Sequence, residues 1–136
     1  MLETLKLYAA TLPIFLAIDM IWLGVIMAGF YNSELGALAR RSGEALAPHW
    51  PSALLVYFLI PLGIVLYVVP KGAGDPLATA LWGALFGLIL YGVYDLTNYA
   101  TLAGWPARLV VVDMLWGAVV CGIVALIASY IAPLMR

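Results

Sequence analysis

The sequence predicts an all-α fold: an integral membrane four-helix bundle with a short amphipathic helix at the interface between spans one and two. Of its 136 residues, 66% are hydrophobic and 10% are charged, against the roughly 25% charged that is typical of soluble domains. A soluble domain of this size could not bury so much apolar surface. The apolar residues also form four blocks, each about the 17 to 25 residues that a helix needs to cross the ~30 Å hydrocarbon core of a bilayer.

We expect residues 1–136 to form a single transmembrane domain that contacts the lipid bilayer. Its spans are expected at about 5–30, 52–69, 77–102 and 107–133. Pro13 should bend the first span because it frees a backbone carbonyl. The turn composition of 70–76 predicts a tight antiparallel hairpin between spans two and three. Gly104-Trp105-Pro106 separates the last two spans.

The connection between the first two spans, residues 31–51, is the only extended hydrophilic stretch. The apolar residues in it have helix-like spacing, which predicts a short helix on the membrane surface. These residues are Leu35, Leu38, Ala39 and Leu46. The run from Pro48 to Pro51 should end that helix.

Small residues at helical spacing predict close helix packing. Gly83 and Gly87 form a G-x-x-x-G pattern, and Gly117, Cys121 and Ala125 repeat every four residues. Such spacing lets helix backbones approach closely in lipid.

Charge excludes a nucleic-acid partner, because the net charge is -1 and no cluster of Lys or Arg occurs. It leaves the membrane orientation open. The terminal side carries Lys6, Lys71 and Arg136, and the opposite side carries Arg40, Arg41 and Arg108. Because this count is tied, the positive-inside rule gives no preference. Two copies could then insert in opposite directions, and a homodimer is one way in which four-span chains could build a path.

Three of the seven acidic residues, Asp19, Asp95 and Asp113, interrupt the apolar spans. Each costs about 2.5 to 3.5 kcal/mol at the centre of a spanning helix, so each needs compensation. At about 1.5 Å per residue, Asp19 lies roughly 16 Å, Asp95 roughly 11 Å and Asp113 roughly 10 Å below the same surface. This agreement in depth favours one shared polar site.

Neighbouring side chains extend the candidate site. Asp19-Met-Ile-Trp22 and Asp113-Met-Leu-Trp116 are nearly the same tetrapeptide, and each places an indole near its carboxylate. The third span adds hydrogen-bonding groups around Asp95. The candidate residues for binding a substrate or an ion are Asp19, Asp95, Asp113, Asn98, Tyr91, Tyr99, Trp22 and Trp116.

Other polar and aromatic residues are assigned to the membrane interface. Arg108 precedes Asp113 by five residues, which points the two side chains toward nearly opposite faces, so Arg108 should reach the interface or a neighbouring helix. Aromatic residues near the span ends are expected to form the interfacial belt. They are Trp50, Trp82, Trp105, Tyr8 and Tyr130.

The leading functional hypothesis is a site that binds or moves protons, a cation or a small solute, because carboxylates crowded in a low dielectric share protons. One alternative is a membrane-embedded enzyme that acts on a lipid or isoprenoid substrate with a divalent cation. Another is a structural subunit whose polar side chains only join helices. The sequence contains no recognised metal or diphosphate motif and no nucleophilic Ser–His pair, so no metal site, cofactor or catalytic residue is assigned.

Several motifs, in order along the chain, resemble those of one family of small bacterial predicted membrane proteins, domain of unknown function 2177. They are Ala17–Gly24, Phe30-Tyr31 with Leu35-Gly36, Tyr94–Asn98 with Ala100–Leu102, Trp105-Pro106 and Val112–Gly117. The resemblance implies a multi-pass protein of the bacterial inner membrane. It brings no activity, substrate or cofactor.

Overall fold

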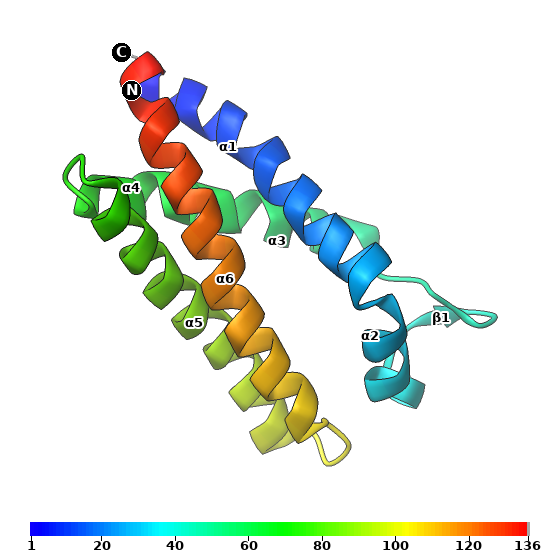
Figure 1. The fold of residues 1–136 in the computed structure, drawn as a ribbon. Coiled ribbons are helices and arrows are strands. Elements are labelled where there is room, and N and C mark those ends of the chain that lie inside the picture. Colours follow the sequence, from blue (N-terminus) through cyan, green and yellow to red (C-terminus); the bar gives the residue numbers. More distant parts are fainter. Residues whose placement is uncertain (136) are drawn as a thin grey trace.

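Four long helices make up most of the chain in the computed structural model, which describes residues 1–135 (Figure 1). They are α1 (Leu2–Ile21) with the π-helical turn η1 (Trp22–Ile26), α3 (Trp50–Gly63) with the π-helical turn η3 (Ile64–Val68) and α4 (Val69–Lys71), α5 (Pro76–Thr101), and α6 (Ala107–Ile131) with the 3-10 turn η4 (Ala132–Met135). Each is long and apolar enough to cross a membrane. The all-α membrane fold is therefore confirmed. Arg136, which entered the charge count, lies outside the described residues.

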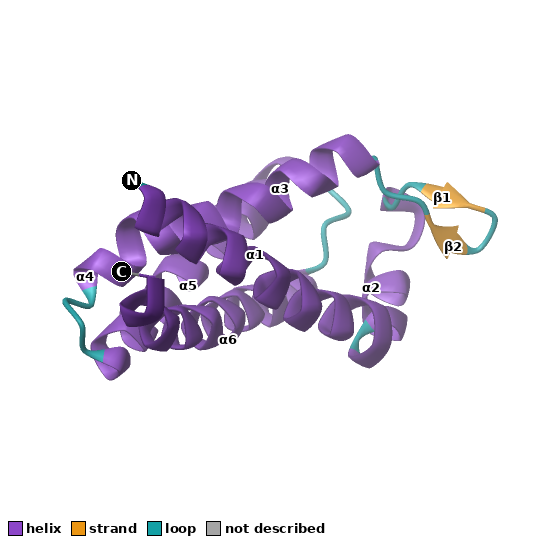
Figure 2. Cartoon of the chain, turned by 90° about the horizontal axis from the view of Figure 1, so that it is seen from above, coloured by secondary structure: helices purple, strands orange, loops and turns teal. Residues whose placement is uncertain are grey.

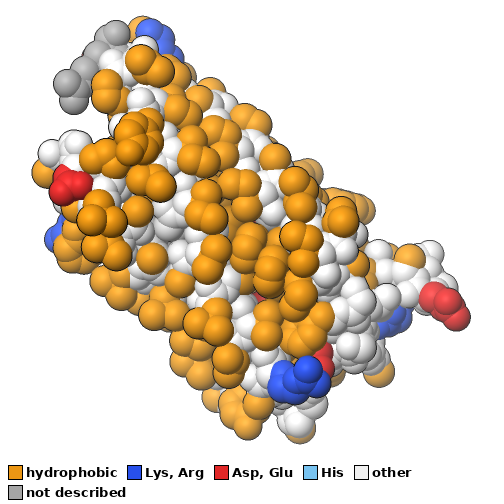
Figure 3. All heavy atoms as spheres, in the orientation of Figure 1, with side chains coloured by type: hydrophobic (Ala, Val, Ile, Leu, Met, Phe, Trp, Pro, Cys, Tyr) orange, Lys and Arg blue, Asp and Glu red, His pale blue; other side chains and the backbone are white. Residues whose placement is uncertain are grey.

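Large apolar side chains cover the outside of the helices. Residues such as Leu81, Val93 and Val119 are exposed on α5 and α6. Figure 3 shows apolar side chains across the visible face, with Lys and Arg near its ends. Such a surface is stable only against lipid tails, so these helices contact the bilayer.

Helix α6 lies at the centre of the bundle. In its most apolar stretch, 39% of the residues are buried, against 17% in α1. It packs against α5, α1 and η3. Helix α3 is held by α1, because the Tyr8 hydroxyl donates to the Phe58 carbonyl at 3.1 Å.

Helices α5 and α6 run side by side in both views (Figures 1 and 2), and small residues bring their backbones together. A Cβ atom added at Gly83 would lie 2.5 Å from Cβ of Ala125, and one added at Gly87 would lie 1.9 Å from the carbonyl oxygen of Gly117. The close packing predicted from the small-residue patterns is confirmed.

The predicted turn between spans two and three is present, but the spans are tightly paired only near the turn, where η3 and α4 pack against α5. Helix α4 ends at Lys71, and α5 begins at Pro76 after Asp75, whose carboxylate caps the helix by accepting from the N–H groups of Leu77 and Ala78. Ala73 and Gly74 take positive φ angles of 51° and 86° in this turn. From it α3 and α5 diverge in direction (Figure 1).

The connection between the first two spans differs from the prediction. Helix α2 (Ala28–Leu35) and the 3-10 turn η2 (Gly36–Leu38) are helical, but strands β1 (Arg41–Ser42) and β2 (Ala45–Leu46) form an antiparallel hairpin. The helix prediction is therefore wrong beyond Leu38. The physical reason is positive φ at two glycines, Gly36 at 47° and Gly43 at 63°, which end the helix and turn the hairpin. Figure 2 shows the hairpin projecting beyond the helices.

Gly87→Ala is expected to destabilise the bundle by about 1 to 3 kcal/mol, because the new methyl group collides with a backbone carbonyl. Thermal unfolding in maltoside micelles measures the loss. Gly29→Ala is the matched control: Gly29 lies in α2, and a Cβ there meets nothing within 4 Å. Equal unfolding temperatures for the two variants would contradict this account of the α5–α6 contact.

Candidate functional site

A cavity of about 510 Å³ lies inside the bundle, and all four long helices and α2 contribute to its wall. The wall is mainly apolar and aromatic. It includes two of the three predicted carboxylates, Asp19 from α1 and Asp113 from α6, and no Lys, Arg or His among the residues that line it.

Asp19 lies near the C-terminal end of α1, with its side chain turned into the bundle and only 3% exposed. Its Oδ1 accepts a hydrogen bond of 2.8 Å from the indole N–H of Trp116 on α6. The hydroxyl of Tyr57, on α3, lies beside the same carboxylate. Asp19 therefore joins α1 to α6 through a buried hydrogen bond, next to a tyrosine of α3 on the same cavity wall.

The carboxylate of Asp113 on α6 receives its hydrogen bond from α2. Its Oδ1 accepts a hydrogen bond from the hydroxyl of Tyr31 on α2. That hydroxyl in turn accepts from the indole N–H of Trp22 at 3.1 Å. The π-helical turn that contains Trp22 ends at Ile26, and Met27 separates it from α2. This break lets Tyr31 return to the bundle.

The Trp of each Asp-Met-x-Trp segment thus supports the Asp of the other segment. The indoles of Trp22 and Trp116 stack, with ring centroids 4.1 Å apart and planes within 3° of parallel. Trp116 donates directly to the Asp of the first segment, whereas Trp22 reaches the Asp of the second through Tyr31. The stacked indoles therefore connect the two carboxylates through hydrogen bonds, one of them direct and one through Tyr31.

Tyr31 keeps its proton at neutral pH. Burial raises the pKa of its phenol well above the ordinary value of about 10, and the hydrogen bond to Asp113 raises this pKa further. The hydroxyl is therefore a permanent donor toward Asp113, because the phenolate form is disfavoured.

Asp95, the third acid of the predicted shared site, is not among the residues that line the cavity. Its side chain is fully buried, and its Oδ1 accepts from the indole N–H of Trp105 at 3.3 Å. Its Oδ2 has no hydrogen-bond partner among the described residues. The Trp105 ring packs edge-on against Tyr94, which lines the cavity. Trp105 was expected in the interfacial belt, and in the structure it lies in the turn between α5 and α6 with its N–H directed inward to the acid.

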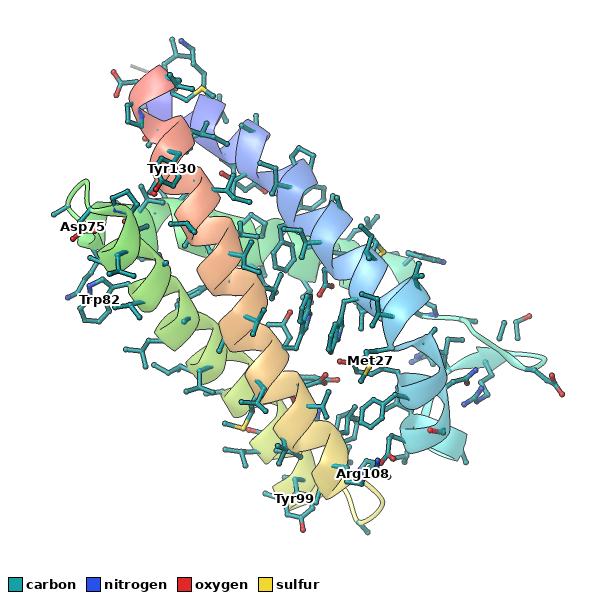
Figure 4. All side chains as sticks on the ribbon, in the orientation of Figure 1. Met27, Asp75, Trp82, Tyr99, Arg108 and Tyr130 are labelled. Atoms are coloured by element: carbon teal, nitrogen blue, oxygen red, sulfur yellow. The ribbon has the colours of Figure 1, made fainter. Side chains whose placement is uncertain are left out.

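Of the remaining predicted residues of α5, one lines the cavity and two do not. Tyr91 lines the cavity and packs on Gly117, where an added Cβ would lie 2.5 Å from its ring. Asn98 is partly buried but does not line the cavity. Tyr99 is 54% exposed and points away from the bundle (Figure 4). The cavity and the indole stack thus bring together Asp19, Asp113, Tyr91, Trp22 and Trp116.

Arg108 does not compensate a buried acid. Its Nη1 lies 3.3 Å from Oε1 of Glu34 on α2, and its guanidinium lies over the ring of Phe30, 5.8 Å from the centroid. Figure 4 shows it at the end of the bundle. As the spacing predicted, it contacts a neighbouring element rather than Asp113.

Sequence reasoning missed three residues that contact the acids: Tyr31, Tyr57 and Trp105. The available signal for Tyr31 was its place in the Phe30-Tyr31 motif, since by composition it only began the hydrophilic connection. Tyr57 stands alone in an uncharged span, so nothing in the pattern marked it.

The residues around the cavity do not form a metal ligand set. Among residues 1–135, no group of three or more His, Cys, Asp or Glu could hold a metal ion. A Ser–His pair that the sequence analysis did not identify lies outside the cavity wall. Nδ1 of His49 lies 2.8 Å from Oγ of Ser52, and both are exposed at the start of α3. Because this spacing of three residues fits a contact within the first helical turn, we read the pair as local to that turn.

Tyr31→Phe is expected to lower stability by about 1 to 3 kcal/mol, because the Trp22 N–H and the Asp113 carboxylate both lose a buried partner. The wild type should also lose stability as the pH rises above about 10, because the unfolded phenol then releases its proton while the folded one retains it. Tyr31→Phe should show a smaller loss. Unfolding temperatures from pH 8 to about pH 11 measure both effects, with Tyr67→Phe as the lipid-exposed control. Identical pH profiles for all three proteins would contradict the assigned role of Tyr31.

Comparison with protein families identifies a family of membrane proteins. The family model described as predicted membrane protein (DUF2177) matches residues 4–130, which include all three membrane-depth acids and Tyr31. No curated protein and no solved structure matches the chain significantly. The resemblance drawn from the motifs is confirmed, and the chain belongs to the DUF2177 family of predicted membrane proteins.

Proposed function

We propose that this protein of the bacterial inner membrane binds a small, positively charged solute in its cavity and transports it across the membrane. The solute binds in exchange for protons held by Asp19 and Asp113. The observation that carries the proposal is the placement of two carboxylates from different helices on the wall of one cavity that has no cationic lining residue. Because no positively charged side chain of residues 1–135 lines the wall, the two carboxylates need a proton or a bound cation to neutralise them.

The energetics support an exchange site over a purely structural one. An Asp at the centre of a spanning helix costs about 2.5 to 3.5 kcal/mol, whereas a hydrogen bond between membrane helices contributes about 0.6 kcal/mol on average. The donors from Trp116 and Tyr31 therefore orient the two carboxylates but do not offset two full charges. Neutralisation by protons or by a cationic ligand does so.

The alternative of a metal-dependent enzyme acting on a lipid or isoprenoid substrate has less support. Such chemistry needs several oxygen ligands converging on one ion. Asp19 and Asp113 line the cavity, but Asp95 does not. The carboxylates therefore suit a monovalent charge better than a hard divalent ion.

The test is cation binding coupled to proton release. Purified protein in maltoside micelles and weak buffer is titrated with tetraphenylphosphonium, while calorimetry follows binding and a pH electrode follows released protons. We expect about one proton per cation bound near neutral pH. Asp19→Asn and Asp113→Asn should each weaken binding at least tenfold, about 1.4 kcal/mol, and reduce the proton release.

Asp75→Asn is the matched control, because Asp75 is exposed in the α4–α5 turn and asparagine also caps helices well. It should bind as the wild type does. Binding that is the same in all four proteins, or binding without proton release at any pH, would refute the proposal.

A further inference from the structure

We propose that the solute is a single-chain amphiphile with an alkylammonium head, and that it enters from the bilayer between α3 and α5. This inference rests on the proposed function and adds the chemical class of the ligand and its route.

The route follows from exposed residues on the cavity wall. Val56 and Leu59 on α3 and Leu90 on α5 line the cavity, yet they are 52%, 62% and 37% exposed on the lipid-facing surface. The helices that carry them diverge from the α4–α5 turn, where η3 and α4 pack on α5 and close that end (Figure 1). The wall is thus open toward lipid tails at the depth of the acids.

The inner end suits an ammonium head. Asp19 and Asp113 supply negative charge, and the rings of Tyr57, Tyr91 and Trp116 line the same space. Aromatic faces attract quaternary and protonated amines through their quadrupoles, and the attraction grows when water is excluded. An anionic head would meet two carboxylates there without any cationic side chain.

The outer part suits one hydrocarbon chain. Apart from the acids and the aromatic groups, the residues that line the wall are aliphatic, and they include Leu23 and Ile60. The volume of about 510 Å³ lies within the roughly 300 to 1,000 Å³ of sites that take one small molecule. A longer chain could extend through the mouth into the bilayer.

Three probes distinguish the contribution of the cationic head to binding from that of the hydrocarbon chain. Dodecyltrimethylammonium has both, tetramethylammonium has the head alone, and dodecyl sulfate has the chain with the opposite charge. Each is titrated calorimetrically into the protein in maltoside micelles, with the Asp19→Asn/Asp113→Asn variant in the same micelles as the blank. We expect dodecyltrimethylammonium to bind at least thirtyfold more tightly than either of the others.

The route is tested with two tryptophans on one helix. Leu59→Trp should narrow the mouth and lower the affinity or the association rate for dodecyltrimethylammonium at least tenfold. Leu55→Trp is matched to it, because Leu55 is also 62% exposed on α3 but does not line the cavity, and it should have no effect. Unfolding temperatures of the two variants verify that both fold.

The outcomes distinguish this inference from the proposed function. If tetramethylammonium binds as tightly as dodecyltrimethylammonium and both need the two acids, the proposed function stands and the amphiphile is refuted. If dodecyl sulfate binds equally well, head selection is refuted. If Leu59→Trp and Leu55→Trp behave alike, entry between α3 and α5 is refuted. If no cation binds to the wild type, both proposals fall.

Discussion

The structure depends on the need to compensate carboxylates at membrane depth with donors from other helices. A helix in lipid satisfies its own backbone, but its Asp side chains must find partners across the bundle. Here Asp19 on α1 takes its donor from α6, and Asp113 on α6 takes its donor from α2. The acids therefore determine how α1, α2 and α6 meet, and the Trp22–Trp116 stack fixes their spacing.

The glycine-lined contact between α5 and α6 makes the cavity possible. Gly83 and Gly87 let α5 pack closely on α6, and the large side chains of Phe86 and Leu90, each three residues after one of these glycines, form part of the cavity wall. Helix α3 completes the wall while being held mainly by α1. The close α5–α6 contact and part of the cavity wall are thus built from neighbouring positions on the same helix.

The segment after the first span links the cavity to the membrane surface. Tyr31 faces the acid, while Glu34, one turn later on α2, pairs with Arg108 at the start of α6. Arg41 anchors the following hairpin through hydrogen bonds to Asn32, Gly36 and Glu44. The chain therefore holds α2 from both sides, with a buried contact and a surface ion pair.

The sequence by itself determined the membrane-spanning class, the turn at 70–76 and the small-residue helix contact, and it singled out the two Asp-Met-x-Trp segments, because each depends on composition or on spacing within one helix. It predicted depth from helical rise, but depth does not give rotation about the helix axis. Only the tertiary structure therefore separated Asp95 from the cavity and turned Tyr99 outward. Likewise, Tyr31 and Tyr57 reach the acids from elements distant in the chain, and no local pattern encodes a contact that forms only when helices pack.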